Sequence, residues 1–130
     1  MDMLAPIGWT KAPGYAHGVA ASGKLVFVSG QVGWDEKQRF TADDLVGQVR
    51  MALENVVVVV AAAGGRPEHV ARMTWYVTDK LEYMRLRREI GEAYRMVMGR
   101  HYPAMSVVEV SGLVEDAALV EIEATAVVPA

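Results

Sequence analysis

Leu25-Val26-Phe27-Val28-Ser29-Gly30-Gln31 is the stretch of sequence that decides the fold class. Its β-branched and aromatic side chains favour a strand. Successive strand residues point to opposite sides, so the first four of these residues are apolar on both faces. Val107-Val108, near the other end of the chain, repeats this pattern. Strands that are apolar on both faces are typical of sheets that are covered on both sides.

The segments around this stretch predict a mixed sheet with two helices. Residues 15–21 predict a first strand, and Ser22-Gly23 predicts a tight hairpin turn into a second strand over residues 24–30, because glycine allows positive φ. Strands are predicted over residues 70–78, 105–112 and 118–128, and a helix over residues 79–98. With a helix over residues 45–63, the order is ββαβαββ. This order indicates the α+β class, with both helices on one face of the sheet.

The helix over residues 45–63 contains one stretch whose conformation is ambiguous. Thr41-Ala42-Asp43-Asp44 can cap its first N–H groups, and Gly64-Gly65 can end it. Val56–Val60, five valines in a row, would alone favour a strand. Apolar residues nevertheless recur at spacings of three and four: Leu45, Val49, Ala52, Val56, Val60 and Ala63. The periodicity therefore predicts a helix.

Two helices cover only one face of the sheet, so the other face needs a partner. The chain offers no further element for this purpose. We therefore predict that it forms an oligomer through the open face of its sheet, where each covered apolar side chain contributes about 1.5–3 kcal/mol. The alternative is a monomer with apolar patches on its sheet surface.

Composition narrows the functional classes. The 130 residues are the usual length of one domain, so residues 1–130 are expected to form a single domain. The absence of cysteine excludes disulfides, thiolate metal sites and cysteine nucleophiles. A formal net charge of -3 argues against nucleic acid as a partner. The longest apolar run, Val56–Ala63, is far shorter than the ~20 residues that span a bilayer, and Met1–Pro6 lacks the pattern of a signal peptide. These features predict a cytoplasmic protein with no membrane partner.

Few titratable side chains form a catalytic arrangement. His17, His69 and His101 lack metal-ligand spacing, so no metal is expected. Glu121 and Glu123 alternate with apolar residues of the last strand, which places both carboxylates on one face. Either this face is solvated, or an oligomer partly covers it and a carboxylate there activates a water molecule.

Arginines on the second helix allow two interpretations as well. Arg85, Arg88 and Arg95 fall on a face shared with Glu92. Such a face is usually solvated and internally paired. The alternative is that a guanidinium reaches an anionic ligand.

Four segments, in their order and spacing, resemble one known family. They are Gly14-Tyr15-Ala16-His17-Gly18-Val19, Leu25-Val26-Phe27-Val28-Ser29-Gly30-Gln31, Tyr102-Pro103-Ala104-Met105-Ser106-Val107-Val108-Glu109-Val110 and Val120-Glu121-Ile122-Glu123-Ala124. From Tyr15 to Val128 the chain resembles the Rid family of reactive intermediate deaminases, also called YjgF-like or L-PSP endoribonuclease-like. The resemblance implies a chorismate-mutase-like α+β fold that packs as a homotrimer with three clefts between subunits.

The resemblance also implies an activity and a site. RidA-type members hydrolyse enamines and imines, such as 2-aminoacrylate, to a 2-oxo acid and ammonia without cofactor or metal. By this likeness Glu121 positions the attacking water and Tyr15 lines the cleft. Ser29, Gly30 and Gln31 correspond to the Ser-Gly-Gln wall of the family.

The chain departs from the family at the residue that holds the substrate carboxylate. Met105 stands where the family has a clamping arginine, and Val107 stands where many members have a cysteine. Arg88 aligns roughly with a cleft-side asparagine and is a hypothetical substitute anchor. A thioether cannot offer the paired charge-assisted bonds of a guanidinium, and it makes that end of the cleft apolar and adaptable.

Three functions remain open from the sequence. The first is an imine or enamine deaminase with an altered substrate preference. The second is a non-catalytic trimeric module that binds an apolar or aromatic small molecule in the cleft between subunits. A ribonuclease ranks last, because it follows only from an older family name and the chain lacks a basic, aromatic surface.

Overall fold

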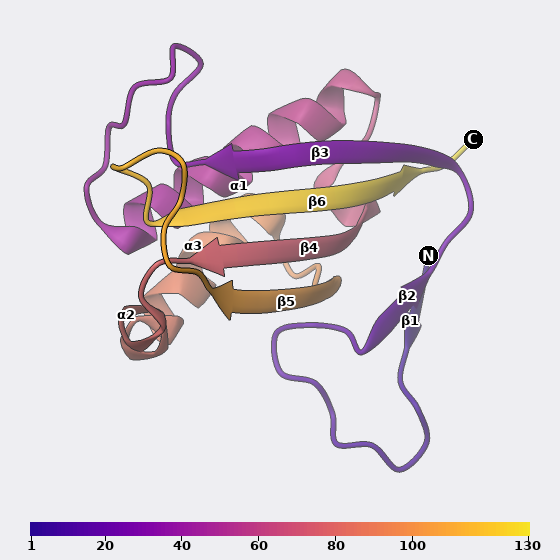
Figure 1. The fold of residues 1–130 in the computed structure, drawn as a ribbon. Coiled ribbons are helices and arrows are strands. Elements are labelled where there is room, and N and C mark those ends of the chain that lie inside the picture. Colours follow the sequence, from indigo (N-terminus) through magenta and orange to yellow (C-terminus); the bar gives the residue numbers. More distant parts are fainter.

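A four-stranded sheet carries its helices on one face in the computed structural model, which describes residues 1–130 (Figure 1). An N-terminal arm, residues 1–20, forms a short two-stranded ribbon beyond the sheet. The elements in chain order are β1 (Asp2–Leu4), β2 (Gly18–Ala20), β3 (Lys24–Val32), α1 (Leu45–Ala62), the 3-10 helix η1 (Pro67–His69), β4 (Val70–Val77), α2 (Lys80–Arg85), α3 (Arg87–Met98), β5 (Ala104–Glu109) and β6 (Val120–Val128).

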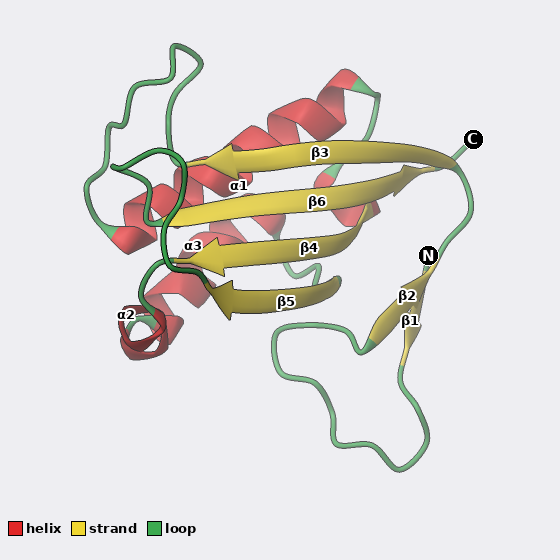
Figure 2. Cartoon of the chain, in the orientation of Figure 1, coloured by secondary structure: helices red, strands yellow, loops and turns green.

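The main sheet is mixed and has the strand order β3-β6-β4-β5. β6 pairs antiparallel with both β3 and β4, whereas β4 and β5 run parallel. A parallel pair needs a long crossover connection, which α2 and α3 supply. Figure 2 shows α1 and α3 behind the sheet, whose other face carries no helix. The predicted α+β class with a mixed sheet is confirmed.

α1 is helical throughout its run of valines, as its periodicity predicts. The Asp44 carboxylate caps it by accepting a hydrogen bond from Gly47 N, and the helix ends just before Gly64, which has a φ of 81°. Val56 and Val60 are completely buried, so packing outweighs the preference of valine for strands. By length and composition alone α1 could also cross a membrane, a test that the core helix of a soluble protein passes equally.

The predicted helix over residues 79–98 is wrong in one respect, because it is divided at Leu86. Asp79 caps α2 by accepting hydrogen bonds from the N–H groups of Leu81 and Glu82. Leu86 leaves helical geometry, with φ -102° and ψ 15°, while its side chain packs against the core. Leucine is a good helix former, so the residue at position 86 does not predict a break in the helix. The fold therefore contains three α-helices instead of the two predicted.

The predicted hairpin through Ser22-Gly23 is also wrong. The strand predicted over residues 15–21 contracts to β2, which pairs antiparallel with β1 outside the main sheet. Gly23 has a φ of 150°, and a side-chain carbon there would come within 2.3 Å of the Val128 carbonyl oxygen. The glycine thus permits a close approach of two backbones. From the sequence alone, a glycine with this role cannot be distinguished from a glycine in a tight turn.

The face of the sheet opposite the helices, which we call the open face, holds apolar side chains in solvent. Leu25 and Phe27 of β3 are 58% and 74% exposed. Val26 and Val28, which alternate with them, pack into the core beneath the helices. β3 is therefore apolar on both faces, and a single chain covers only one of them. The oligomer through the open face stays a prediction.

Candidate functional site

Strand alternation divides the predicted site residues between the two faces of the sheet. Met105 of β5 lies opposite Met73 of β4, whose side chain is completely buried beneath the helices. Val107, two residues further along β5, has the same orientation. Glu121 of β6 lies opposite Tyr76 of β4 and points toward the open face. Glu121 and Met105 therefore belong to two separate groups of residues, one on each face of the sheet.

The first group surrounds Glu121. A register shift between Val28 and Gln31 makes β3 bulge where it pairs with β6. There the Glu121 carboxylate lies against the backbone of Gly30, since a side-chain carbon at that glycine would come within 2.3 Å of Glu121 Oε2. Gln31 Nε2 donates hydrogen bonds to the carbonyl and hydroxyl oxygens of Ser29, at 3.1 and 3.2 Å. The structure thus brings Glu121 to the Ser-Gly-Gln segment.

The two glutamates of β6 differ in their partners. Glu123 Oε1 accepts a hydrogen bond of 2.6 Å from the Tyr76 hydroxyl, and this bond raises the pKa of Tyr76. Glu121 accepts no hydrogen bond and forms no ion pair within the chain. The structure contains no cluster of three or more His, Cys, Asp or Glu side chains that could hold a metal ion. Glu121 therefore keeps both oxygens available to a molecule such as water.

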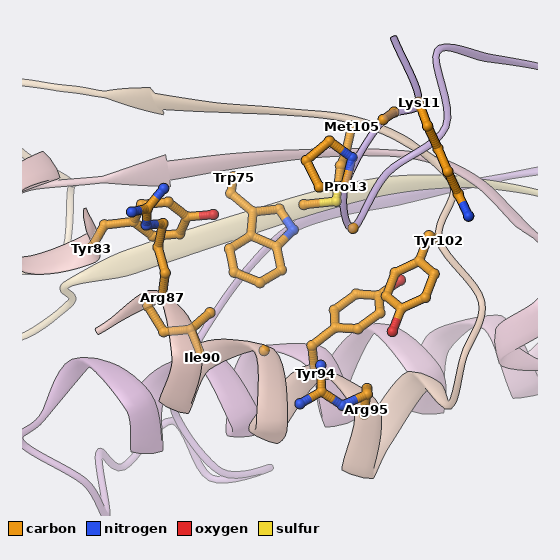
Figure 3. A pocket seen from close by; sticks show the side chains of 13 residues that line it. Lys11, Pro13, Trp75, Tyr83, Arg87, Ile90, Tyr94, Arg95, Tyr102 and Met105 are labelled. Carbon is orange, nitrogen blue, oxygen red and sulfur yellow. The ribbon is translucent and has the colours of Figure 1, made fainter. Parts of the chain in front are cut away.

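The second group lies on the helix side, around a cavity of about 680 Å³ that we call the aromatic pocket (Figure 3). It is bounded by β4, β5, α2, α3 and the N-terminal arm. Four aromatic and two aliphatic side chains form its walls: Trp75, Tyr83, Tyr94, Tyr102, Ile90 and Met105. Met105 thus faces aromatic rings, which a polarisable thioether contacts favourably.

Burial constrains the polar atoms of these walls. The Tyr94 hydroxyl donates a hydrogen bond to the carbonyl oxygen of His101, and burial raises the pKa of Tyr94. Burial also raises the pKa of Tyr83, so both phenols are neutral near pH 7. The Trp75 indole N–H is buried without a hydrogen-bond partner. Such a donor costs about 1–3 kcal/mol.

The rim of the aromatic pocket is positively charged. Arg87 lies at the Tyr83 end, and Lys11 lies at the opposite end (Figure 3). Arg95 folds back over Gly91, where a side-chain carbon would come within 3.3 Å of its Nη1 atom. None of these three cations forms an ion pair, and no carboxylate lines the pocket. The pocket therefore favours an anionic ligand with an apolar body.

Three sequence-predicted site residues lie outside both groups. Arg88 of α3 does not line the aromatic pocket; its side chain is 87% exposed, and its Nε lies 3.6 Å from Glu92 Oε1. Tyr15 of the N-terminal arm meets the His17 ring edge to face and lines a neighbouring cavity of about 370 Å³. Val107 packs against the core. One chain therefore does not assemble all of these residues.

Sequence reasoning found only one residue of the rim of the aromatic pocket, since it named Arg95 among the arginines that could reach an anionic ligand but not Arg87 or Lys11. Arg87, Gly91 and Arg95 of α3 recur every four residues, which is the spacing of one helix face. Grouping the arginines at spacings of three and seven instead drew attention to Arg88. The signal that could have found the site is Gly91, because a glycine between two cations on one helix face leaves room for a guanidinium to fold back over the helix.

The chain matches a known protein family over most of its length. The family model described as endoribonuclease L-PSP matches residues 9–128. The 2-iminobutanoate/2-iminopropanoate deaminase of Salmonella typhimurium is 36% identical to the chain over 113 residues, which cover 87% of this chain and 86% of that protein.

Two solved structures have the same fold. The Rid-family protein YyfB from Yersinia pestis gives a TM-score of 0.81 at 28% identity, and the alignment covers 98% of each chain. The crystal structure of TdcF from E. coli with bound serine gives a TM-score of 0.69 at 35% identity, covering 91% of this chain and 90% of that one. By sequence and by fold, the chain belongs to the endoribonuclease L-PSP family, which is the Rid family of reactive intermediate deaminases.

Proposed function

We propose that this chain is a deaminase that hydrolyses the C=N bond of an imine or of the imine formed from an enamine. The observation that carries the proposal is the Glu121 carboxylate, held against Gly30 on the open face without a partner in its own chain. A carboxylate in this state can hold a water molecule and accept its proton. The name of the relative from Salmonella typhimurium supports the same class of reaction.

The reaction consumes one water molecule and needs no oxidant or reductant. An enamine first gains a proton on carbon and loses one from nitrogen, which gives an imine. Water then adds to the C=N carbon while Glu121 accepts a proton and passes it to the nitrogen, which gives a carbinolamine. The C–N bond breaks, the hydroxyl proton leaves with the nitrogen, and the products are a carbonyl compound and ammonia.

We place the reacting bond between two copies of the chain. Glu121 and Met105 lie on opposite faces of the sheet, so they cannot both contact one small substrate within one chain. Covering exposed side chains such as Leu25 and Phe27 contributes about 1.5–3 kcal/mol each. A homotrimer that covers the open face would bring Glu121 of one copy toward the aromatic pocket of the next.

The test is the hydrolysis of imino acids made in place. An L-amino-acid oxidase generates 2-imino acids from alanine, leucine and phenylalanine, and semicarbazide traps the imine that remains. We expect the chain to accelerate the loss of at least one of these imines. Glu121→Gln is expected to lower kcat by about 10²–10⁴-fold, because an amide cannot accept the proton of water.

Glu123→Gln is the matched control. This glutamate lies two residues along the same strand and faces the same way, but its carboxylate is engaged by Tyr76. It is expected to retain activity. The proposal fails if the wild type does not exceed the rate in buffer with any imine, or if Glu121→Gln hydrolyses them as fast as the wild type.

A non-catalytic binding module is the second candidate, and Met105 is the observation that favours it. The family arginine that the resemblance implies at this position would supply bonds of about 1.5–3 kcal/mol each. A metabolite present at a concentration 100 times its dissociation constant would raise the unfolding free energy of the chain by ~2.7 kcal/mol. A binding module would show the same stabilisation in Glu121→Gln. If Met105→Arg alone hydrolyses 2-aminoacrylate, the cleft is catalytic and its preference has changed.

A further inference from the structure

The aromatic pocket carries more positive charge than the hydrolysis of a small imine requires. Arg87 and Arg95 are eight residues apart on α3, or roughly 12 Å along the helix, and Lys11 approaches from the N-terminal arm. Every other arginine of α2 and α3 pairs with a glutamate. Unpaired guanidinium groups on the rim of a cavity are suited to a carboxylate, which they bind through two parallel hydrogen bonds.

The walls between these cations suit an aromatic ring. Tyr94 and Tyr102 stack with ring centroids 5.5 Å apart and planes 14° apart, and the Trp75 ring lies 6.4 Å from Tyr94. Gly91 has no side chain, so the Arg95 guanidinium lies close over the surface of α3, on the rim of the pocket. Met105 adds a polarisable thioether to this apolar surface.

We propose that the aromatic pocket binds a carboxylate that carries an aromatic ring, with the ring against Trp75 and Tyr94 and the carboxylate on Arg95. The inference rests on the proposed function for its substrate class, which is a 2-imino acid with an aromatic side chain; the product is the corresponding 2-oxo acid. Arg95 then holds the group that the family arginine holds by resemblance, and Met105 becomes part of the surface for the ring.

Equilibrium binding tests the inference without turnover. Calorimetry compares three probes: indole-3-acetate, the neutral indole-3-acetamide of nearly the same shape, and acetate, which lacks the ring. We expect indole-3-acetate to bind at least about tenfold more tightly than the amide, because a guanidinium bonds more strongly to a charged oxygen than to a neutral one. Acetate is expected to bind more weakly still.

Variants of neighbouring arginines locate the anchor. Arg95→Gln is expected to lower the affinity for indole-3-acetate to that for the amide, and to leave the affinity for the amide unchanged. Arg95→Lys keeps the charge but loses the paired bonds, so an intermediate affinity is expected. Arg85→Gln is the matched control, because Arg85 pairs with Glu82 and does not line the pocket. It is expected to bind as the wild type does.

Two results would overturn the inference. One is equal affinity of the wild type for indole-3-acetate and for its amide. The other is a preference for indole-3-acetate over its amide that does not depend on Arg95. This would show as an unchanged preference in Arg95→Gln, or as a preference that is lost in Arg88→Gln instead. Far-ultraviolet circular dichroism shows whether each variant is folded.

The inference and the proposed function fail separately. Binding through Arg95 without hydrolysis of any imine upholds the inference and refutes the deaminase. Hydrolysis of the imine from alanine, with no preference for aromatic carboxylates, upholds the deaminase and refutes the inference.

Discussion

Gly30 determines where the Glu121 carboxylate lies. The φ of Gly30 is not positive, so its backbone does not itself require glycine. Space requires it, because a side-chain carbon would come within 2.3 Å of Oε2 and 2.7 Å of Cδ of Glu121. The residue type at position 30 is therefore set by the side chain that must lie over it.

Gly30→Ala is expected to reduce activity much more than stability. The new methyl group displaces a carboxylate at the end of a flexible side chain, which should cost less than about 1 kcal/mol of unfolding free energy. Displacement of the reacting group should lower kcat for imine hydrolysis by about 10²-fold. Kinetics and urea denaturation of the same samples measure both effects.

Gly112→Ala is the control for this substitution, since nothing lies within 4 Å of the side-chain carbon that it adds. It should leave both quantities unchanged. A large loss of stability in Gly30→Ala with kcat intact would show that the glycine serves the fold instead of the carboxylate.

Gln48 joins α1 to the loop that leads into β6. It is 1% exposed, and its Nε2 donates to the carbonyl oxygens of Ala42 and Ala117 at 3.1 and 2.9 Å. Its Oε1 accepts a hydrogen bond of 2.8 Å from Leu119 N. One buried amide therefore satisfies three backbone groups and fixes the entry of β6, the strand that carries Glu121.

Gln48→Leu is expected to lower the free energy of unfolding by about 2–4 kcal/mol, since it leaves buried backbone groups without partners. Urea denaturation measures the change. Val58→Ala, at an exposed position of the same helix, should change the free energy by no more than about 0.5 kcal/mol. An equal loss in both variants would mean that the hydrogen bonds of Gln48 contribute nothing of their own.

Tyr94 of α3 makes the stability of the fold depend on pH in the alkaline range. Burial raises the pKa of Tyr94 above its ordinary value of 10.0. Above pH 10 the unfolded chain releases the phenol proton of Tyr94, while the folded chain keeps it. The contribution to stability is therefore complete below pH 10 and is lost as the pH rises toward the folded-state pKa.

Tyr94→Phe should consequently flatten the alkaline loss of stability. Between about pH 10 and pH 12, its unfolding free energy should fall less steeply than that of the wild type, by up to ~1.4 kcal/mol per pH unit. Urea denaturation at several pH values measures both slopes. Parallel slopes would contradict the raised pKa.

Elements set by a repeating pattern could be predicted from the sequence, whereas those set by a single contact could not. The period of apolar residues predicted α1 against the strand preference of Val56–Val60, and alternation placed Glu121 and Glu123 on one face. The break at Leu86 and the backbone approach at Gly23 depend on packing partners that are distant in sequence. In the site, the same limit hid the place of Arg87 beside Arg95 on the rim of the aromatic pocket, because the phase of α3 depends on the break at Leu86.

The whole chain presents its two groups of site residues in opposite directions. The aromatic pocket opens on the helix side, near the N-terminal arm, whereas Glu121 and the exposed Phe27 belong to the open face. A monomer would leave each group incomplete. The oligomer that we propose is therefore part of the site as well as a cover for apolar surface.

Phe27→Glu is expected to separate the subunits and abolish imine hydrolysis. A charge on the open face would have to be desolvated in the assembly, while the core of each chain on the other side of the sheet stays intact. Light scattering should give three times the 14.2 kDa chain mass for the wild type and 14.2 kDa for the variant. Val58→Glu, on the exposed side of α1, is the control. A monomeric, active wild type would contradict the shared site.

Placing the two groups on opposite faces has a genetic consequence. In a trimer each cleft would take its carboxylate from one gene product and its anion anchor from another. Two alleles, Glu121→Gln and Arg95→Gln, would each be defective alone toward an aromatic imino acid. Co-expressed in equal amounts, they would leave about a quarter of the clefts with both contributions intact. The alleles should therefore complement each other within one cell, although each alone encodes a protein that is defective toward this substrate.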